Sequence, residues 1–197
     1  MIFFFKTVAK VLIFILLVSN NSFANTRDAE FNDWLNSFKK TALKKGISQN
    51  TIDVALKDVK FLEQVIKYDR KQPEFYEDTI TYVKKRANET RVKKARKLLK
   101  QNYELFIEIE EKFNVEKEIL LALWGIETNF GKHVGKMDII SSLATLSFDK
   151  RRRDFFTSQL LTLLQLIDDK LLSPDELYGS WAGAFGNFQF MPSTIKS

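Results

Sequence analysis

Apolar side chains recur along most of this chain at intervals of three and four residues, the spacing of one face of an α-helix. The first stripe, from Phe31 to Phe38, predicts a helix that Gly46 ends, and Ser48 can cap a second helix whose apolar positions run to Val59. Further stripes predict helices over about residues 74–86, 92–113, 119–124 and 156–171. We therefore expect a mainly α-helical protein, and no convincing pair of strands is recognisable.

Prolines mark further boundaries of the predicted helices. Gln72 should be extended, because the residue before Pro73 avoids helical angles. The run Ser173-Pro174-Asp175-Glu176 combines a cap residue, a first-turn proline and a capping-box glutamate, and so predicts a helix start. Met191-Pro192-Ser193-Thr194 predicts another helix start near the end of the sequence.

Six of the seven glycines lie between residues 125 and 186. Glycine is favoured where the backbone turns tightly or approaches another group closely. The end of a helix is enough to account for Gly131. It is a poorer account of three glycines within residues 179–186, which indicate a closely packed or ligand-facing loop.

Residues 1–24 have the pattern of a secretory signal peptide. Lys6 and Lys10 lead into an apolar run over residues 11–18, and Ser22 and Ala24 are the small residues that a signal peptidase requires. An uncleaved N-terminal anchor is the alternative, although the apolar run is short for a membrane span. We expect an exported, periplasmic chain without stable membrane insertion after cleavage, with a single domain over residues 25–197.

Composition excludes several classes of protein. The chain has no cysteine, which excludes disulfides, thiol chemistry and a lipid-modified cysteine after the signal peptide. Its one histidine, His133, has no ligand cluster around it, so neither a metal nor another cofactor is expected. No nucleic-acid-binding motif is recognisable, and no nucleic-acid partner is expected.

The net charge is mildly positive. It falls from +6 to +4 without residues 1–24, which contain two lysines and no acidic residue. Basic clusters occur at residues 84–86, 93–94 and 151–153. They could attract an acidic polymer, but charge alone favours ordinary solvated helix faces.

Glu127 is the candidate acid–base residue. The spacing of Leu120, Leu123, Trp124 and Glu127 places all four on one helical face, so a carboxyl group continues an apolar stripe. Burial there would favour the protonated carboxyl group, and a helix that ends near Gly131 would act in the same direction. Protonation of a glycosidic oxygen requires such a group. A glutamate at the exposed edge of the stripe has the same spacing, and periodicity alone favours that alternative.

A second carboxylate, the usual partner in glycoside hydrolysis, is not evident. The nearest downstream acids are Asp138 and Asp149, and neither lies in an obviously buried context. The residues therefore offer one acid and no clear nucleophile or water-activating base.

Four blocks of the chain resemble lytic murein transglycosylases of the membrane-bound B type. Residues 122–131 (ALWGIETNFG) look like the catalytic helix of that family, and residues 69–75 (DRKQPEF) resemble an upstream block. Residues 142–148 (SLATLSF) and 179–193 (GSWAGAFGNFQFMPS) resemble two later blocks. The resemblance extends from about residue 28 to the end, and the order of the blocks makes it specific.

The resemblance implies a mainly α, lysozyme-like (goose-type-like) catalytic core with an N-terminal helical part and a peptidoglycan groove. It also implies cleavage of the β-1,4 bond between N-acetylmuramic acid and N-acetylglucosamine, with a 1,6-anhydro ring as product. One carboxyl group then suffices, because it protonates the leaving oxygen and later takes the proton of the C6 hydroxyl. Glu127 would be this group, and the lack of a second carboxylate is then expected.

The resemblance assigns four further residues to the groove. Ser180 matches a serine that lies near the catalytic glutamate and can hydrogen-bond it. Gln189 and Met191 match residues that contact sugar, and Tyr82 falls at the spacing of a tyrosine that lines the site. Helix packing is the alternative for Tyr82, and core packing for Met191.

Three functions remain open at this point. The chain could be a lytic transglycosylase or the N-terminal part of one, a hydrolytic muramidase, or a non-catalytic remnant that binds peptidoglycan. The family continues well past residues 179–193, so we expect the C-terminal portion of the domain to be missing. Peptidoglycan glycan strands are the expected partner of a monomeric chain.

Overall fold

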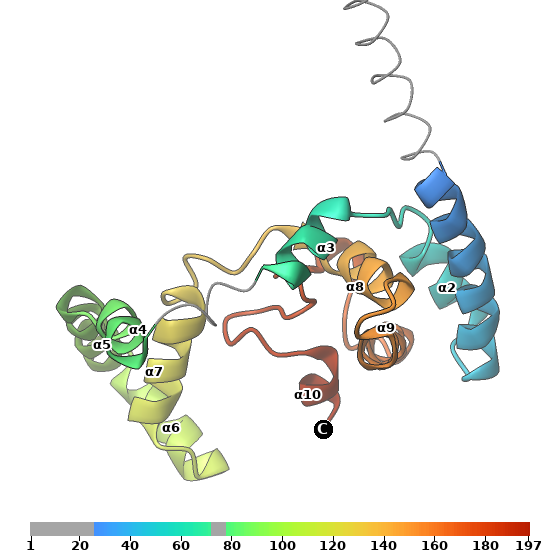
Figure 1. Cartoon of the computed structure of the whole chain (residues 1–197). Helices are drawn as coiled ribbons and strands as arrows, with labels where there is room; N and C mark the ends of the chain where they lie inside the picture. Colours follow the sequence, from blue (N-terminus) through green and yellow to red (C-terminus); the bar gives the residue numbers. More distant parts are fainter. Residues whose placement is uncertain (1–25, 72–77) are drawn as a thin grey trace, which may run out of the picture.

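The computed structural model describes residues 26–71 and 78–197. The predicted signal peptide and the link at Gln72-Pro73 lie outside this part of the chain. Figure 1 shows two groups of helices, with the helices of residues 79–128 on one side and those of residues 49–70 and 139–168 on the other. Nowhere in the two described ranges is a helix both long enough and apolar enough to cross a membrane.

The first group forms the main core around one fully enclosed helix. It comprises a helix over residues 26–44, α2 (Gln49–Ala55), α3 (Glu63–Arg70), α8 (Ile139–Phe148) and α9 (Arg153–Asp168). Residues 139–147 of α8 are all buried, because α3 and α9 pack against it. The hydroxyl groups of Ser141 and Thr145 accept hydrogen bonds from the backbone N–H groups of Lys60 and Leu62, at 3.1 and 3.0 Å.

The second group has a smaller core of its own. It comprises α4 (Thr79–Arg86), α5 (Glu89–Gln101), α6 (Tyr103–Phe113) and α7 (Lys117–Thr128). The last three helices pack around Phe106, Leu121 and Phe130, and α4 contributes no buried residue. The prediction of one continuous helix over residues 92–113 is wrong, because the helix breaks at Asn102. Both α5 and α6 pack against α7, so the apolar periodicity continues across the break.

Short elements join the two groups. Strand β1 (Met137–Asp138) pairs antiparallel with β2 (Tyr178–Gly179), which corrects the expectation of no strand pair. Two residues in each strand are too few to produce a recognisable alternation.

The predicted helix start at residues 173–176 is a single 3₁₀ turn, η2 (Pro174–Glu176), and the Ser173 side chain forms no cap hydrogen bond. A short helix, α10 (Pro192–Lys196), begins after Met191 as predicted.

Candidate active site

Glu127 lies in the last turn of α7, and its side chain is exposed. The buried face of α7 consists of Leu121, Gly125 and Thr128. The buried apolar stripe is therefore not found at Glu127, and the exposed position that periodicity alone favours is confirmed. α5 and α6 cover a neighbouring face, and Leu123 is 42 % exposed. The burial that would favour a protonated carboxyl group is absent.

The C-terminal end of α7 turns sharply just after Glu127. Asn129 and Phe130 have left-handed φ angles of 52° and 59°, and the Phe130 N–H donates to the Trp124 carbonyl at 3.1 Å. This 6→1 bond is typical of a Schellman helix end. The turn places the Phe130 ring over Gly125, where a Cβ atom would lie 2.8 Å from Phe130 Cζ.

A lysine of α5 binds the same helix end. The Lys94 ammonium donates to the Asn129 carbonyl at 3.1 Å and lies 4.9 Å from the centre of the Phe130 ring. A cation is favourable at the C-terminal end of a helix, where the carbonyl groups carry the negative end of the dipole. The backbone that carries Glu127 is thus fixed from the side of α5.

Thr128 and Asn187 connect this helix end to residues 179–191. The fully buried Thr128 hydroxyl donates to the Asn187 carbonyl at 2.8 Å and accepts from the Gly131 N–H at 3.0 Å. The Trp124 indole N–H donates to Asn187 Oδ1 at 3.2 Å. The sequence reasoning assigned no role to Thr128 or Asn187. The position of Thr128 on the same helical face as Leu121 was the available signal.

Residues 179–186 form a tight turn against α8, as their glycines indicate. Gly183 has a φ of 90°, and a Cβ atom there would lie 2.3 Å from Leu143 Cδ2. The Ser180 hydroxyl accepts from the Ala184 N–H at 3.0 Å, and the Ser180 N–H donates to the Ala184 carbonyl at 2.8 Å. Within residues 26–71 and 78–197, Glu127 forms no hydrogen bond with Ser180.

The remaining predicted site residues lie on three different elements. Gln189 has a left-handed φ of 48°, and its Nε2 donates to the carbonyls of Val134 and Gly186 at 3.0 and 2.9 Å. Met191 packs partly against the main core. Tyr82 is half-buried on α4, with the Arg86 guanidinium 4.9 Å from its ring centre. These contacts of Gln189 lie within the surrounding loops. The contact between Tyr82 and Arg86 lies within α4.

Asp69, in the block at residues 69–75, is a buried charge whose partners are arginines. Its side chain is 1 % exposed and accepts from Arg70 and Arg151 at 2.8 and 3.0 Å, and also from Arg152. Burial by itself would raise the pKa of Asp69, but the hydrogen bonds and positive charges of Arg152 and Arg151 outweigh it and lower that pKa below its usual value of 3.8. Two arginines of the basic cluster at residues 151–153 therefore join α3 to the turn before α9.

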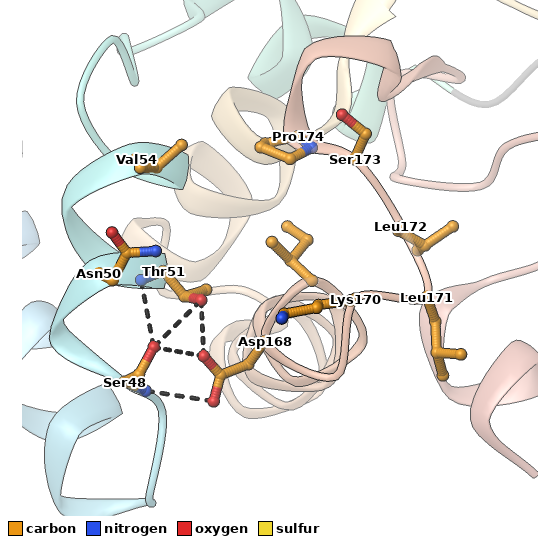
Figure 2. A pocket seen from close by; sticks show the side chains of 11 residues that line it. Ser48, Asn50, Thr51, Val54, Asp168, Lys170, Leu171, Leu172, Ser173 and Pro174 are labelled. Atoms are coloured by element: carbon orange, nitrogen blue, oxygen red, sulfur yellow. Dashed lines mark hydrogen bonds between the residues drawn. The ribbon is translucent and has the colours of Figure 1, made fainter.

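A separate depression of about 470 Å³ lies between the start of α2 and the residues that follow α9 (Figure 2). Asp168 links the end of α9 to the start of α2 along this depression. Its carboxylate accepts hydrogen bonds from Thr51 Oγ1 at 2.6 Å and from both the hydroxyl and the N–H of Ser48. These bonds lower the pKa of Asp168, with the Ser48 hydroxyl as the main cause. None of the predicted site residues lines this depression.

The described residues include no group of three or more histidine, cysteine or acidic side chains that could bind a metal ion.

Comparison with known proteins gives one consistent result. Residues 30–197 match the transglycosylase SLT domain family. A stretch of 85 residues is 44% identical to membrane-bound lytic murein transglycosylase B of Escherichia coli K12, and it covers 43% of this chain and 24% of that protein.

Solved structures show the same similarity. SltB3 from Pseudomonas aeruginosa, in complex with NAG-anhNAM-pentapeptide, superposes with a TM-score of 0.79 and 34% identity over 84% of this chain and 44% of that one. The Escherichia coli lytic transglycosylase Slt35, in complex with bulgecin A, gives a TM-score of 0.70 and 30% identity over 86% of this chain and 54% of that one. The expected mainly helical, lysozyme-like fold is confirmed, and the chain spans about half the length of these structures.

Proposed function

This chain belongs to the transglycosylase SLT domain family, and from that membership we propose that it is a lytic transglycosylase of peptidoglycan. The proposed reaction cleaves the β-1,4 bond between N-acetylmuramic acid and N-acetylglucosamine and leaves a 1,6-anhydro end. The observation that carries the proposal is the similarity to SltB3, whose structure contains NAG-anhNAM-pentapeptide, a ligand with such an anhydro sugar.

Glu127 is the proposed acid–base residue. Its carboxyl group gives a proton to the glycosidic oxygen as the bond to muramic C1 breaks. The resulting carboxylate takes the proton of the C6 hydroxyl as O6 bonds to C1, so the reaction consumes no water. An exposed carboxyl group at a fixed helix end is accessible to a polymer, and the bound sugar would supply the desolvation that the free protein lacks.

The groove would be completed by residues from the loop that Asn187 joins to α7. We propose that Ser180, Gln189 and Met191 contact the glycan on this side and that Tyr82 contacts it from α4. The Thr128–Asn187 contact supports this arrangement, because it fixes the helix of Glu127 relative to the loop of Ser180 and Gln189. We further propose export to the periplasm through the signal peptide at residues 1–24.

A second candidate is a non-catalytic chain that binds peptidoglycan. It is favoured by one observation, namely that the side chain of Glu127 is exposed and forms no hydrogen bond with Ser180 within the described residues. A protein of this kind would bind purified sacculi and release no soluble fragments.

The test is fragment release from sacculi by the chain and its Glu127→Gln variant. We expect the chain to release muropeptides that weigh one water less than hydrolytic products, and we expect Glu127→Gln to bind sacculi without releasing them. Glu118→Gln is the matched control, because Glu118 is an exposed glutamate on the same helix. Release by Glu127→Gln at the rate of the control would refute the role of Glu127. Hydrolytic fragments would identify a muramidase instead, and binding without release by the unmodified chain would identify the non-catalytic protein.

A further inference from the structure

The positive charge of this protein is concentrated on two neighbouring helices. Residues 79–101, which form α4, α5 and the turn between them, contain nine lysines and arginines and one glutamate, a net charge of +8. The whole chain carries +6, so all other residues together are slightly acidic. We call residues 79–101 the basic arm. Figure 1 shows α4 and α5 at the outer end of their helix group, far from α2 and α9.

Most of this charge is not neutralised within the described part of the protein. Glu89, the single acid of the basic arm, pairs with Lys93 at 3.6 Å, but both side chains are more than three-quarters exposed, so the pair is weak. Lys84, Lys97 and Lys100 are exposed and form no salt bridge with described residues. A dense, exposed charge of one sign attracts a surface of the opposite sign.

Exposed apolar surface lies beside these charges. A groove of about 250 Å³ runs between α5 and α7, with arginines 86, 91 and 96 among its lining residues. Its apolar lining includes Val92 and Ile126, which are 38 % and 42 % exposed. Val83 is 53 % exposed and shares the helical face of Arg86, which extends the apolar surface onto α4.

We propose that the basic arm binds the surface of an anionic phospholipid bilayer. Phosphate headgroups would pair with the arginines and lysines, and the apolar side chains would enter the boundary between headgroups and acyl chains. The apolar component favours a bilayer over an acidic wall polymer, because a polymer that carries only charge offers Val83, Val92 and Ile126 nothing to pack against. Such binding would hold the enzyme at the membrane surface without a membrane-spanning helix.

The test is co-sedimentation of the protein with phosphatidylethanolamine vesicles that contain or lack phosphatidylglycerol. The protein is purified in the form that its host produces after any processing of the N-terminus. The arm variant replaces Lys84, Lys97 and Lys100 with glutamine. The control variant replaces Lys40, Lys44 and Lys45, which are exposed lysines near the end of the N-terminal helix, and so changes the net charge equally. A Val83→Ser variant tests the apolar contribution, and circular dichroism confirms that each variant is folded.

We expect binding that requires phosphatidylglycerol and weakens as salt is added. A lysine near an anionic surface strengthens binding roughly fivefold, so the arm variant should bind roughly 100-fold more weakly, while the control variant binds as the unmodified chain does. Val83→Ser should weaken binding several-fold at a salt concentration that screens the charges.

Three results would overturn the proposal. Equal binding to both kinds of vesicle would exclude recognition of anionic headgroups. Equal losses in the arm and control variants would show that only net charge matters. Loss of binding to purified sacculi by the arm variant, with vesicle binding unchanged, would show that the basic arm recognises an acidic wall polymer.

Discussion

Replacing Asp69 with asparagine should destabilise the fold, because three arginines share this one buried carboxylate. The substitution keeps the shape of the side chain and removes its charge. Asp69 Oδ2 accepts from Arg70 and Arg151, so an asparagine that keeps its oxygen toward Arg152 would place an amide N–H₂ group against two guanidinium donors.

The expected size of the effect follows from burial. A hydrogen bond to a charged group contributes about 1.5–3 kcal/mol, so two lost bonds correspond to a gross loss of about 3–6 kcal/mol. The arginine side chains are 38–48 % exposed, so water recovers part of this loss. We expect a net loss of about 2–3 kcal/mol in the free energy of unfolding, which lowers Tm by roughly 4–12 °C in a domain of this size.

The effect should also depend on pH in a defined direction. The pKa of Asp69 is lower in the folded protein than its ordinary value of 3.8, so its ionised form stabilises the fold above that value. This stabilisation is lost as the pH falls from 3.8 through the folded pKa. The difference in Tm between the unmodified chain and Asp69→Asn should therefore be constant near neutral pH and shrink under acid conditions.

Thermal and urea unfolding, followed by circular dichroism from neutral to acid pH, measures both effects. Asp58→Asn is the matched control, since Asp58 is exposed and its replacement should change stability by less than about 0.5 kcal/mol. If Asp69→Asn unfolds like Asp58→Asn, or if its deficit does not change in acid, the buried carboxylate does not hold the arginines as described.

Two further substitutions test contacts around the proposed site. Thr128→Val removes the hydroxyl that donates to the Asn187 carbonyl, and it should lower kcat for fragment release with little change in KM. Thr128→Ser keeps the hydroxyl and should restore much of the lost kcat. Equal activity of both variants would exclude a positioning role for Thr128. In urea unfolding, Gly183→Ala should destabilise the fold by at least about 2 kcal/mol more than Gly46→Ala. Both glycines have φ near 90°, but only a Cβ atom at residue 183 would press against Leu143. Equal losses of stability would show that backbone strain alone matters.

Periodicity predicted most of the amphipathic helices and missed two helices for different reasons. α8 is buried on every side, and its run of isoleucine, leucine, serine, alanine and threonine has no polar face that would mark it as a helix. α3 was also missed, because its eight residues contain only a short stripe around Val65 and Ile66. The break at Asn102 was not predicted, because the apolar spacing on both sides of it stays helical.

The residues of the candidate site are selected by the sequence blocks and not by periodicity. The spacing of Leu120, Leu123 and Glu127 does not say which neighbouring face the partner helices cover, and they cover the face of Leu121. The contact between Thr128 and Asn187 joins residues far apart in the chain, and no local pattern encodes such a pair. Glycines were the long-range signal: Gly183 lacks a side chain where Leu143 approaches it, and Gly135 lacks one where the backbone of Gly179 approaches it.

The Thr128–Asn187 contact has a consequence for the order of assembly during synthesis. The two residues are 59 positions apart, so the end of α7 cannot take its final position until residue 187 has been made. A nascent chain that stops short of residue 187 would carry Glu127 on a helix whose end is held by Lys94 and not yet by Asn187. The carboxyl group proposed to cut the glycan would then be aligned only after residue 187 has been added, which would delay cleavage until the loop that contains Asn187 has folded against α7.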